Sequence, residues 1–227
     1  MSTFNVVNQH CLNHISNLTE THEVMASEDI CDENGMKLWA KGKPVSKALQ
    51  ERLLSRKLRV PLELTLEVQG GASKESVVQR ARELCDQEPD LGALLGLGAR
   101  SVFAALAEAP VEKALRLLLT CTQNTPTGCF DHAVKVSMLA VAMGLRGNLP
   151  QRELDTLVIG GLAHDVGELY VNPGYLTNPR QLSLTEWQHV AVHPLIGQKV
   201  ITELTTLNKD VGLIIAGHHE HEDGSGY

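Results

Sequence analysis

The sequence of 227 residues is poor in aromatic side chains, which make up 4% of it, while hydrophobic residues make up 43%. A core must therefore consist of Leu, Val, Ala and Ile, a composition that suits packed helices. Positive charge is also scarce, since the formal net charge is −7. Proteins that bind nucleic-acid polymers or membrane surfaces need a positive field, so this charge argues against both classes. A small anionic ligand held by metal ions is still compatible with it.

The sequence also lacks paired cysteine motifs and long apolar runs. The cysteines are odd in number, widely spaced and form no Cys-x-x-Cys motif: Cys11, Cys31, Cys85, Cys121 and Cys129. This usage indicates reduced thiols and not a disulfide framework. No apolar run approaches the ~20 residues that span a bilayer, and no basic segment leads into an apolar one at the amino terminus. We therefore expect a cytoplasmic protein without a membrane partner.

Residues 1–70 combine short helical and strand patterns. The Asn34-Gly35 pair predicts a hairpin, because both residue types tolerate positive φ. Leucines at helical spacing predict a helix over 46–58, and alternation in "VPLELTLEV" predicts a half-buried strand over 60–68. We interpret residues 1–70 as a small α+β regulatory module.

The sequence from Ser73 onward is almost wholly helical in pattern. Helices are expected over 73–89, with Ser73 as the N-cap, and over 91–106 and 111–123. The Gly96-Leu97-Gly98 segment is a weak phosphate-loop candidate, because it lacks a preceding strand and a third glycine. Helix packing accounts for it better. We interpret residues 71–124 as a helical connector.

Seven of the ten histidines lie between His132 and His221. Four segments carry the most suggestive ones, each beside an apolar helical pattern: His132, His164-Asp165, His193 and His218-His219. A helical bundle could aim these segments at one interior point. Adjacent histidine and aspartate can then hold two metal ions, with the carboxylate as a bridge. Such a pair lowers the pKa of a shared water and clamps phosphodiester oxygens.

Each of these residues also has a simpler interpretation when it is taken alone. His132 fits a hydrogen-bonded core histidine, and His193, before a proline, fits a helix end. An ion pair would explain His164-Asp165, and a solvated loop would explain His218-His219. Only the joint occurrence of the four segments favours a metal centre.

From about Thr125 to the last residue, the chain resembles the HD-GYP branch of the HD phosphohydrolase superfamily. The matching segments are "FDHAVKV", "LAHDVGEL", "LSLTEWQHVAVHPLIG" and "HHEHEDGSGY". The last one is similar to the family's His-His-Glu and Asp-Gly-x-Gly-Tyr-Pro motif up to its tyrosine. The resemblance implies a mainly α fold with an HD-type helical bundle over 125–227. We expect the family's usual C-terminal helices to lie outside this sequence.

The resemblance further implies a cytoplasmic bacterial enzyme that hydrolyses cyclic di-GMP with two or three metal ions, often iron or manganese. The expected metal ligands are His132, His164, Asp165, His193, His218 and His219. Asp165 and His164 are the expected catalytic residues, with Asp165 as the bridge. The substrate loop would be Gly224, Ser225, Gly226 and Tyr227, where glycines permit close backbone approach. Family members also use this region to bind diguanylate cyclases, and a homodimer is a further possible assembly.

Some residues depart from the family pattern. Glu168 stands where the family usually has a lysine near the substrate phosphate, and a second habitual lysine is Asn178. Arg180 is a candidate substrate contact that would restore positive charge. Gly128 stands where members with a third metal have a glutamate, so we expect two ions. The remaining histidines match no ligand position and are assigned solvated or packed roles: His10, His14, His22, His189 and His221.

Three functions remain open from the sequence. The first is a metal-dependent cyclic di-GMP phosphodiesterase. The second is a catalytically weak or inactive HD-GYP module that serves as a nucleotide receptor or binds a signalling partner, which Glu168 favours. The third is an HD nucleotide phosphohydrolase with another substrate.

Overall fold

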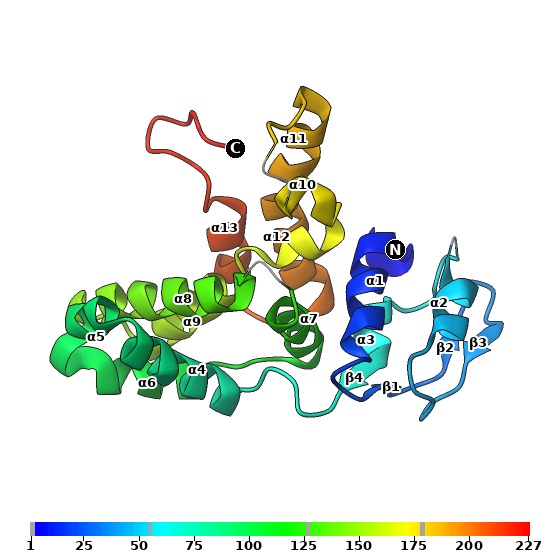
Figure 1. The fold of residues 1–227 in the computed structure, drawn as a ribbon, viewed down its shortest axis with the longest axis horizontal. Helices are drawn as coiled ribbons and strands as arrows, with labels where there is room; N and C mark the ends of the chain where they lie inside the picture. The colour runs from blue at the N-terminus through cyan, green and yellow to red at the C-terminus, as the bar shows by residue number, and fades with distance from the viewer. Residues whose placement is uncertain (1–2, 55, 126–127, 178–179) are drawn as a thin grey trace.

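A computed structural model describes residues 3–54, 56–125, 128–177 and 180–227. The fold is mainly α-helical, as the sequence predicted, and its few strands all lie in the amino-terminal module (Figure 1). The elements of that module are η1 (Thr3–Asn5), α1 (Gln9–Leu18), β1 (Val24–Ala26), β2 (Ile30–Cys31), β3 (Lys37–Trp39), α2 (Lys47–Leu53), α3 (Leu62–Thr65) and β4 (Leu66–Val68).

Two small antiparallel sheets organise this module. Strand β1 pairs with β4, and β2 pairs with β3. The second pair confirms the hairpin predicted at Asn34-Gly35, although only Gly35 adopts a positive φ, of 84°. The Asp32 carboxylate closes the turn by accepting hydrogen bonds from the backbone N–H groups of Asn34 and Met36. The Asp32 side chain therefore stabilises the turn that was predicted from Asn34 and Gly35.

Two sequence expectations in this module were wrong in extent. The helix predicted over 46–58 ends at Leu53. Leu58 instead donates a hydrogen bond from its backbone N–H to the carbonyl of Asn5. The strand predicted over 60–68 is reduced to β4, because Pro61 starts the one-turn helix α3. Glu63 on that turn is 5% exposed, although the alternating pattern would have placed it in solvent.

The connector consists of α4 (Lys74–Gln87), α5 (Pro89–Leu95), η2 (Gly96–Gly98), α6 (Ala99–Glu108) and α7 (Lys113–Gln123). Ser73 caps α4 as predicted and forms a capping box with Ser76. The helix expected over 91–106 is broken at Gly96, where φ is 53°. Helices α4 and α6 pack against α8, so the connector shares its core with the histidine-bearing bundle.

The histidine-bearing region consists of α8 (Cys129–Arg146), α9 (Gln151–Ala163), η3 (Val166–Tyr170), α10 (Pro173–Thr177), α11 (Leu184–Ala191), α12 (His193–Leu204) and α13 (Lys209–Ala216). Helices α8 and α9 pack against each other, and α12 packs against both α13 and η3. The amino-terminal helix α1 also contacts η3. In Figure 1 the loop after α13 returns above α8 and α9 to the end of the chain.

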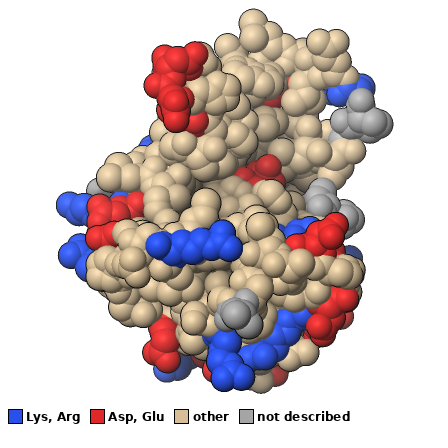
Figure 2. Space-filling view, turned by 90° about the vertical axis from the view of Figure 1, so that its left-hand side faces the viewer, with Lys and Arg blue, Asp and Glu red and all other residues tan. Residues whose placement is uncertain are grey.

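The surface carries charges of both signs. On the face shown in Figure 2, basic side chains are interspersed with acidic ones over the lower part, and acidic groups gather at the upper edge. Within the described ranges, no single helix has the length and apolar character needed to cross a membrane. The sharply bent pair α5 and α6 meets that test only when its two helices are taken together.

Candidate metal centre

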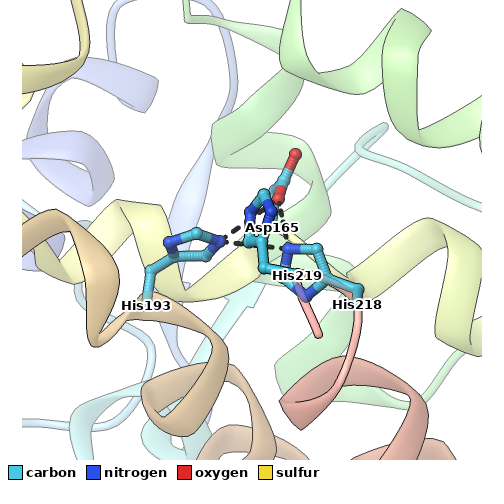
Figure 3. A group of neighbouring side chains, drawn as sticks. All are labelled: Asp165, His193, His218 and His219. Atoms are coloured by element: carbon cyan, nitrogen blue, oxygen red, sulfur yellow. Dashed lines mark hydrogen bonds and ion pairs between the residues drawn. The ribbon is translucent and has the colours of Figure 1, made fainter. Parts of the chain in front are cut away.

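The four histidine segments converge on Asp165. Two overlapping groups of metal-ligating side chains share this residue, and within each group the ligand atoms lie within 4.8 Å of one another. The groups are Asp165 with His193, His218 and His219, and Asp165 with His132 and His164. Figure 3 shows the first group, whose imidazoles surround the carboxylate. The structure thus brings together all six residues that the sequence analysis selected as ligands.

Separate helices supply these side chains, so the centre depends on the packing of the bundle. His132 lies in the first turn of α8, and His193 is the first residue of α12. His164 and Asp165 follow the end of α9, directly before η3. The remaining pair, His218-His219, follows α13. Helix termini place functional side chains on backbone that no longer has to continue a helix, which leaves them free to turn inward.

The two oxygens of the Asp165 carboxylate face different histidines. Oδ2 lies 3.0 Å from His164 Nε2 and 3.9 Å from His132 Nε2. Oδ1 lies 3.3 Å from His218 Nε2 and 3.5 Å from His193 Nε2. A carboxylate oriented in this way would offer one oxygen to each of two cations.

Backbone carbonyls fix the orientation of three imidazoles. The Nδ1 atoms of His164, His193 and His218 lie 2.8, 2.9 and 2.7 Å from the carbonyl oxygens of Gly161, Val190 and Ile215, respectively. In each case the acceptor is three residues earlier in the chain. Because a carbonyl can only accept, Nδ1 must carry the proton, which leaves the Nε2 lone pair directed at Asp165. Metal-binding histidines in general use their second nitrogen in this way.

The donor set fits a bound cation. His193 Nε2 and His218 Nε2 are 3.2 Å apart, and both carry lone pairs if their protons are on Nδ1. Two lone pairs at this distance repel each other, and a shared cation relieves that repulsion. Imidazole together with a carboxylate suits zinc, copper, iron and nickel, and a carboxylate also suits manganese. HD domains are metal-dependent, and the described residues provide the His/Asp groups for such a site.

Burial and neighbouring charges set the protonation of the centre. Burial opposes ionisation of Asp165, but the neighbouring imidazoles of His164, His193 and His218 outweigh it and hold the pKa of the carboxyl well below its usual range. Burial, together with neighbouring imidazoles, lowers the pKa of His132 and His219. A negative carboxylate and neutral imidazoles are the ligand forms that bind metal.

Two glycines allow the helices to approach closely enough to form the centre. A Cβ atom on Gly161 would lie 2.5 Å from the Cα atom of Ser137, where α9 packs on α8. A Cβ atom on Gly167 would lie 2.0 Å from the carbonyl oxygen of His193, where η3 meets α12. Neither contact can be relieved by rotating a side chain. Both positions therefore set the separation of elements that carry ligands.

The end of the chain folds back onto the ligands. The ring of Tyr227 stacks on that of His219, with the centroids 4.5 Å apart and an interplanar angle of 14°. It also meets the edge of Trp187 at 5.4 Å. The backbone N–H of Gly226 donates to Oε1 of Glu220, and that of Ser225 donates to Asp223. The end of this loop, at Tyr227, thus lies beside His219 in the first ligand group.

Other residues singled out in the sequence lie elsewhere. Arg180 forms an ion pair with Glu186 on α11, and His189 on α11 hydrogen-bonds the carbonyl of Thr185. His221 is exposed and contacts Ser225. Gly128 caps α8 with a φ of 69° and offers no carboxylate. The second lysine substitution, Asn178, lies outside the described residues.

Glu168 does not turn away from the centre, and this was not foreseen. It lines a cavity together with Asp165 and with His14 from the amino-terminal module. Burial and the charge of Asp165 raise the pKa of the Glu168 carboxyl. No sequence signal could have placed His14 there, because it precedes Asp165 by most of the chain and matches no ligand spacing.

Comparison with known proteins supports the assignment of this region. Residues 129–226 match the HD domain model. A cyclic di-GMP phosphodiesterase of Pseudomonas aeruginosa is 30% identical over 98 residues, which cover 43% of this chain and 24% of the relative. The cyclic di-GMP phosphodiesterase response regulator RpfG of Xanthomonas campestris is 29% identical over 94 residues, covering 41% and 25%. The 3'3'-cGAMP-specific phosphodiesterase 3 of Vibrio cholerae is 33% identical over 66 residues, covering 29% and 14%.

The matched segments thus span about a quarter or less of these curated relatives. No solved structure matches the chain significantly. The convergent histidines and the helical bundle define residues 129–226 as an HD domain. Within that class, the relatives named as cyclic di-GMP phosphodiesterases support an assignment to the HD-GYP family.

Proposed function

We propose that this protein is a metal-dependent phosphodiesterase that hydrolyses cyclic di-GMP. The observation that carries the proposal is the Asp165 carboxylate, which directs one oxygen to His132 and His164 and the other to His193 and His218. That arrangement suits two cations bridged by Asp165, with His219 completing the group of His193 and His218. Iron and manganese are the metals we propose. When bound, such a pair activates a water for attack on phosphorus and stabilises charge on the phosphoryl oxygens.

The protein's own residues would position the substrate. A groove of about 350 Å³ is lined by His132, His164, Asp165, His218 and His219, and we propose that one phosphodiester of the substrate lies there. The loop from Gly224 to Tyr227 would cover its edge, held by the stacking of Tyr227 on His219. Arg180 pairs with Glu186 on α11, and we propose it as a further contact for the substrate.

The relatives support a cyclic dinucleotide as the substrate class. Two of them are named as acting on cyclic di-GMP and one as specific for 3'3'-cGAMP. A nucleotide receptor with little or no catalytic activity is the second candidate function. Glu168 favours it, because an anionic side chain beside the centre disfavours catalysis on an anionic substrate. Recruitment of diguanylate cyclase domains and formation of a homodimer stay predictions, as does a cytoplasmic location.

The test is incubation of the iron- or manganese-loaded protein, prepared without oxygen, with cyclic di-GMP. Product is followed as linear dinucleotide and as GMP by chromatography. Time-dependent product that disappears in Asp165→Ala and persists in His189→Ala would support the phosphodiesterase. His189 is a suitable control because it is exposed and bonded to its own helix. Saturable binding of cyclic di-GMP without product would instead establish the receptor.

A further inference from the structure

A second cavity shares Asp165 with the histidine groove as a lining residue. Its volume is about 220 Å³, and it is formed where the amino-terminal module, η3 and α10 meet. The lining includes His14, Asp165, Glu168, Leu169, Pro173 and Leu176. Because Asp165 lines this cavity as well as the groove, a molecule bound at the metal centre is within reach of both.

The size of this cavity limits what it can admit. Pockets for whole drug-sized ligands have volumes of roughly 300–1,000 Å³. At about 220 Å³ the cavity is too small for an entire cyclic dinucleotide, but it suits a single ring system. Leu169, Pro173 and Leu176 supply apolar walls, which is the environment that the faces of a heteroaromatic ring prefer.

Glu168 gives this apolar cavity a hydrogen-bond acceptor. Its Oε2 atom lies 3.8 Å from the thiol sulfur of Cys129, a weak donor. An ionised carboxylate has about four lone-pair sites, so among the residues that the structure describes this contact leaves most of its hydrogen-bonding capacity unused. The side chain is half-buried, and a partly desolvated carboxylate favours a ligand that brings donors of its own.

We propose that this cavity binds one guanine base of the cyclic dinucleotide and that Glu168 selects guanine over adenine. This rests on the proposed function and adds a specificity determinant to it. The Watson–Crick edge of guanine presents two adjacent donors, N1–H and the N2 amino group, which match the two oxygens of a carboxylate. Adenine presents an acceptor at N1, whose lone pair would face the same oxygens. His14, at the wall contributed by α1, brings the amino-terminal module into contact with the base.

Position 168 then has a consistent role. A carboxylate that faced the phosphates would weaken binding, whereas one that faces a base edge in the second cavity, which Glu168 lines, strengthens it. The neutral base would occupy the cavity lined by Glu168, and the charged phosphodiester would occupy the groove lined by the histidines. The neutral and the charged parts of the ligand would therefore bind in separate cavities.

The test compares the kcat/KM values of different substrates for the same protein. Differences in metal content between variants then do not affect the ratio. Values of kcat/KM are measured for cyclic di-GMP, 3'3'-cGAMP and cyclic di-AMP with the wild type, Glu168→Gln and Glu153→Gln, the last being an exposed glutamate on α9. Hydrogen bonds to a charged group predict a wild-type preference for cyclic di-GMP over cyclic di-AMP of about 10- to 100-fold. Glu168→Gln should reduce this preference at least about tenfold, and Glu153→Gln should not change it.

A wild-type ratio near one, or an unchanged ratio in Glu168→Gln, overturns the base pocket while leaving the phosphodiesterase intact. If the wild type turns over none of the three, equilibrium binding of the same dinucleotides to the metal-loaded protein replaces the kinetic ratio. If the wild type binds guanine dinucleotides more tightly and Glu168→Gln loses this preference, the base pocket is supported, although the proposed hydrolysis has failed. Equal binding rejects the pocket. Should Glu168→Gln fail to fold, Glu168→Asp, which withdraws the carboxylate by one methylene, serves in its place with the same expected loss.

Discussion

The hydroxyl of Tyr170 donates a hydrogen bond to Oε1 of Glu63 at 2.8 Å, in the buried interface between the amino-terminal module and the HD domain. Tyr170 ends η3, which begins directly after Asp165. Its ring also meets that of Phe4 edge to face at 5.3 Å, and its carbonyl accepts from Asn8. The module is thereby joined to the segment that carries the shared carboxylate.

Removing this hydroxyl is expected to destabilise the protein. Tyr170→Phe leaves the buried Glu63 carboxyl without its strongest donor, and losing one partner of a buried pair costs about 1–3 kcal/mol of unfolding free energy. Urea unfolding measures the effect, with Tyr175→Phe on the half-buried helix α10 as the matched control. A loss for Tyr170→Phe no larger than that of the control would show that the bond contributes nothing to stability.

The Glu63 carboxyl should also make stability depend on pH. Burial raises the pKa of Glu63 above its ordinary value of 4.5, so the folded protein binds this proton more tightly than the unfolded chain. Its contribution is complete below pH 4.5 and is lost as pH rises through the raised pKa. Glu63→Gln keeps the acceptor for Tyr170 but cannot ionise. Between about pH 5 and 8 the unfolding free energy of the variant should therefore fall less steeply than that of the wild type, and parallel curves would contradict this assignment.

Gly167 is expected to be intolerant of a single added methyl group. In Gly167→Ala the new Cβ would lie 2.0 Å from the His193 carbonyl, so η3 and α12 must separate, and Asp165 moves away from His193. Overpacking of this kind costs about 1–3 kcal/mol, and bound metal should fall together with it. Metal analysis and thermal unfolding measure both effects. The control is Gly98→Ala, where the added atom meets nothing within 4 Å and φ is −77°.

The shared carboxylate predicts that one substitution affects both ligand groups. Asp165→Ala should reduce tightly bound transition metal to well below the two ions per chain expected for a binuclear site, because each group loses the same ligand. His189→Ala, at an exposed residue outside both groups, should retain the wild-type content. Elemental analysis of protein purified without oxygen provides the measurement. Wild-type protein with less than about one tightly bound ion per chain would contradict a two-metal centre.

The sequence located the clustered side chains better than their surroundings. The six residues proposed as ligands were selected because their segments match the family pattern and each stands beside a regular apolar helical pattern, and helices with such patterns pack around one core. Gly167 and the carbonyl of His193 could not be paired in advance, since their contact depends on the distance between η3 and α12. The stacking of Tyr227 on His219 likewise depends on how the last loop turns back.

In the amino-terminal module, by contrast, the sequence patterns predicted the wrong extent for two elements. Alternation over 60–68 predicted a strand, but tertiary contacts overrode it, because Glu63 on α3 is needed inside against Tyr170 and Cys11. The helix expected to reach Leu58 stops at Leu53 because residues beyond it form backbone bridges with the start of the chain. Short elements carry too few residues for local preference to outweigh such contacts.

The carbonyl acceptors behind His164, His193 and His218 have a consequence for how the centre tolerates genetic change. In many metal sites the group behind each imidazole is a carboxylate, which one codon change can erase. Here Gly161, Val190 and Ile215 contribute main-chain oxygen, which every amino acid possesses. Drift at Val190 and Ile215 therefore leaves the tautomers of His193 and His218 untouched, so long as the helical backbone stays in place, whereas Gly161 is restricted by its close contact with Ser137.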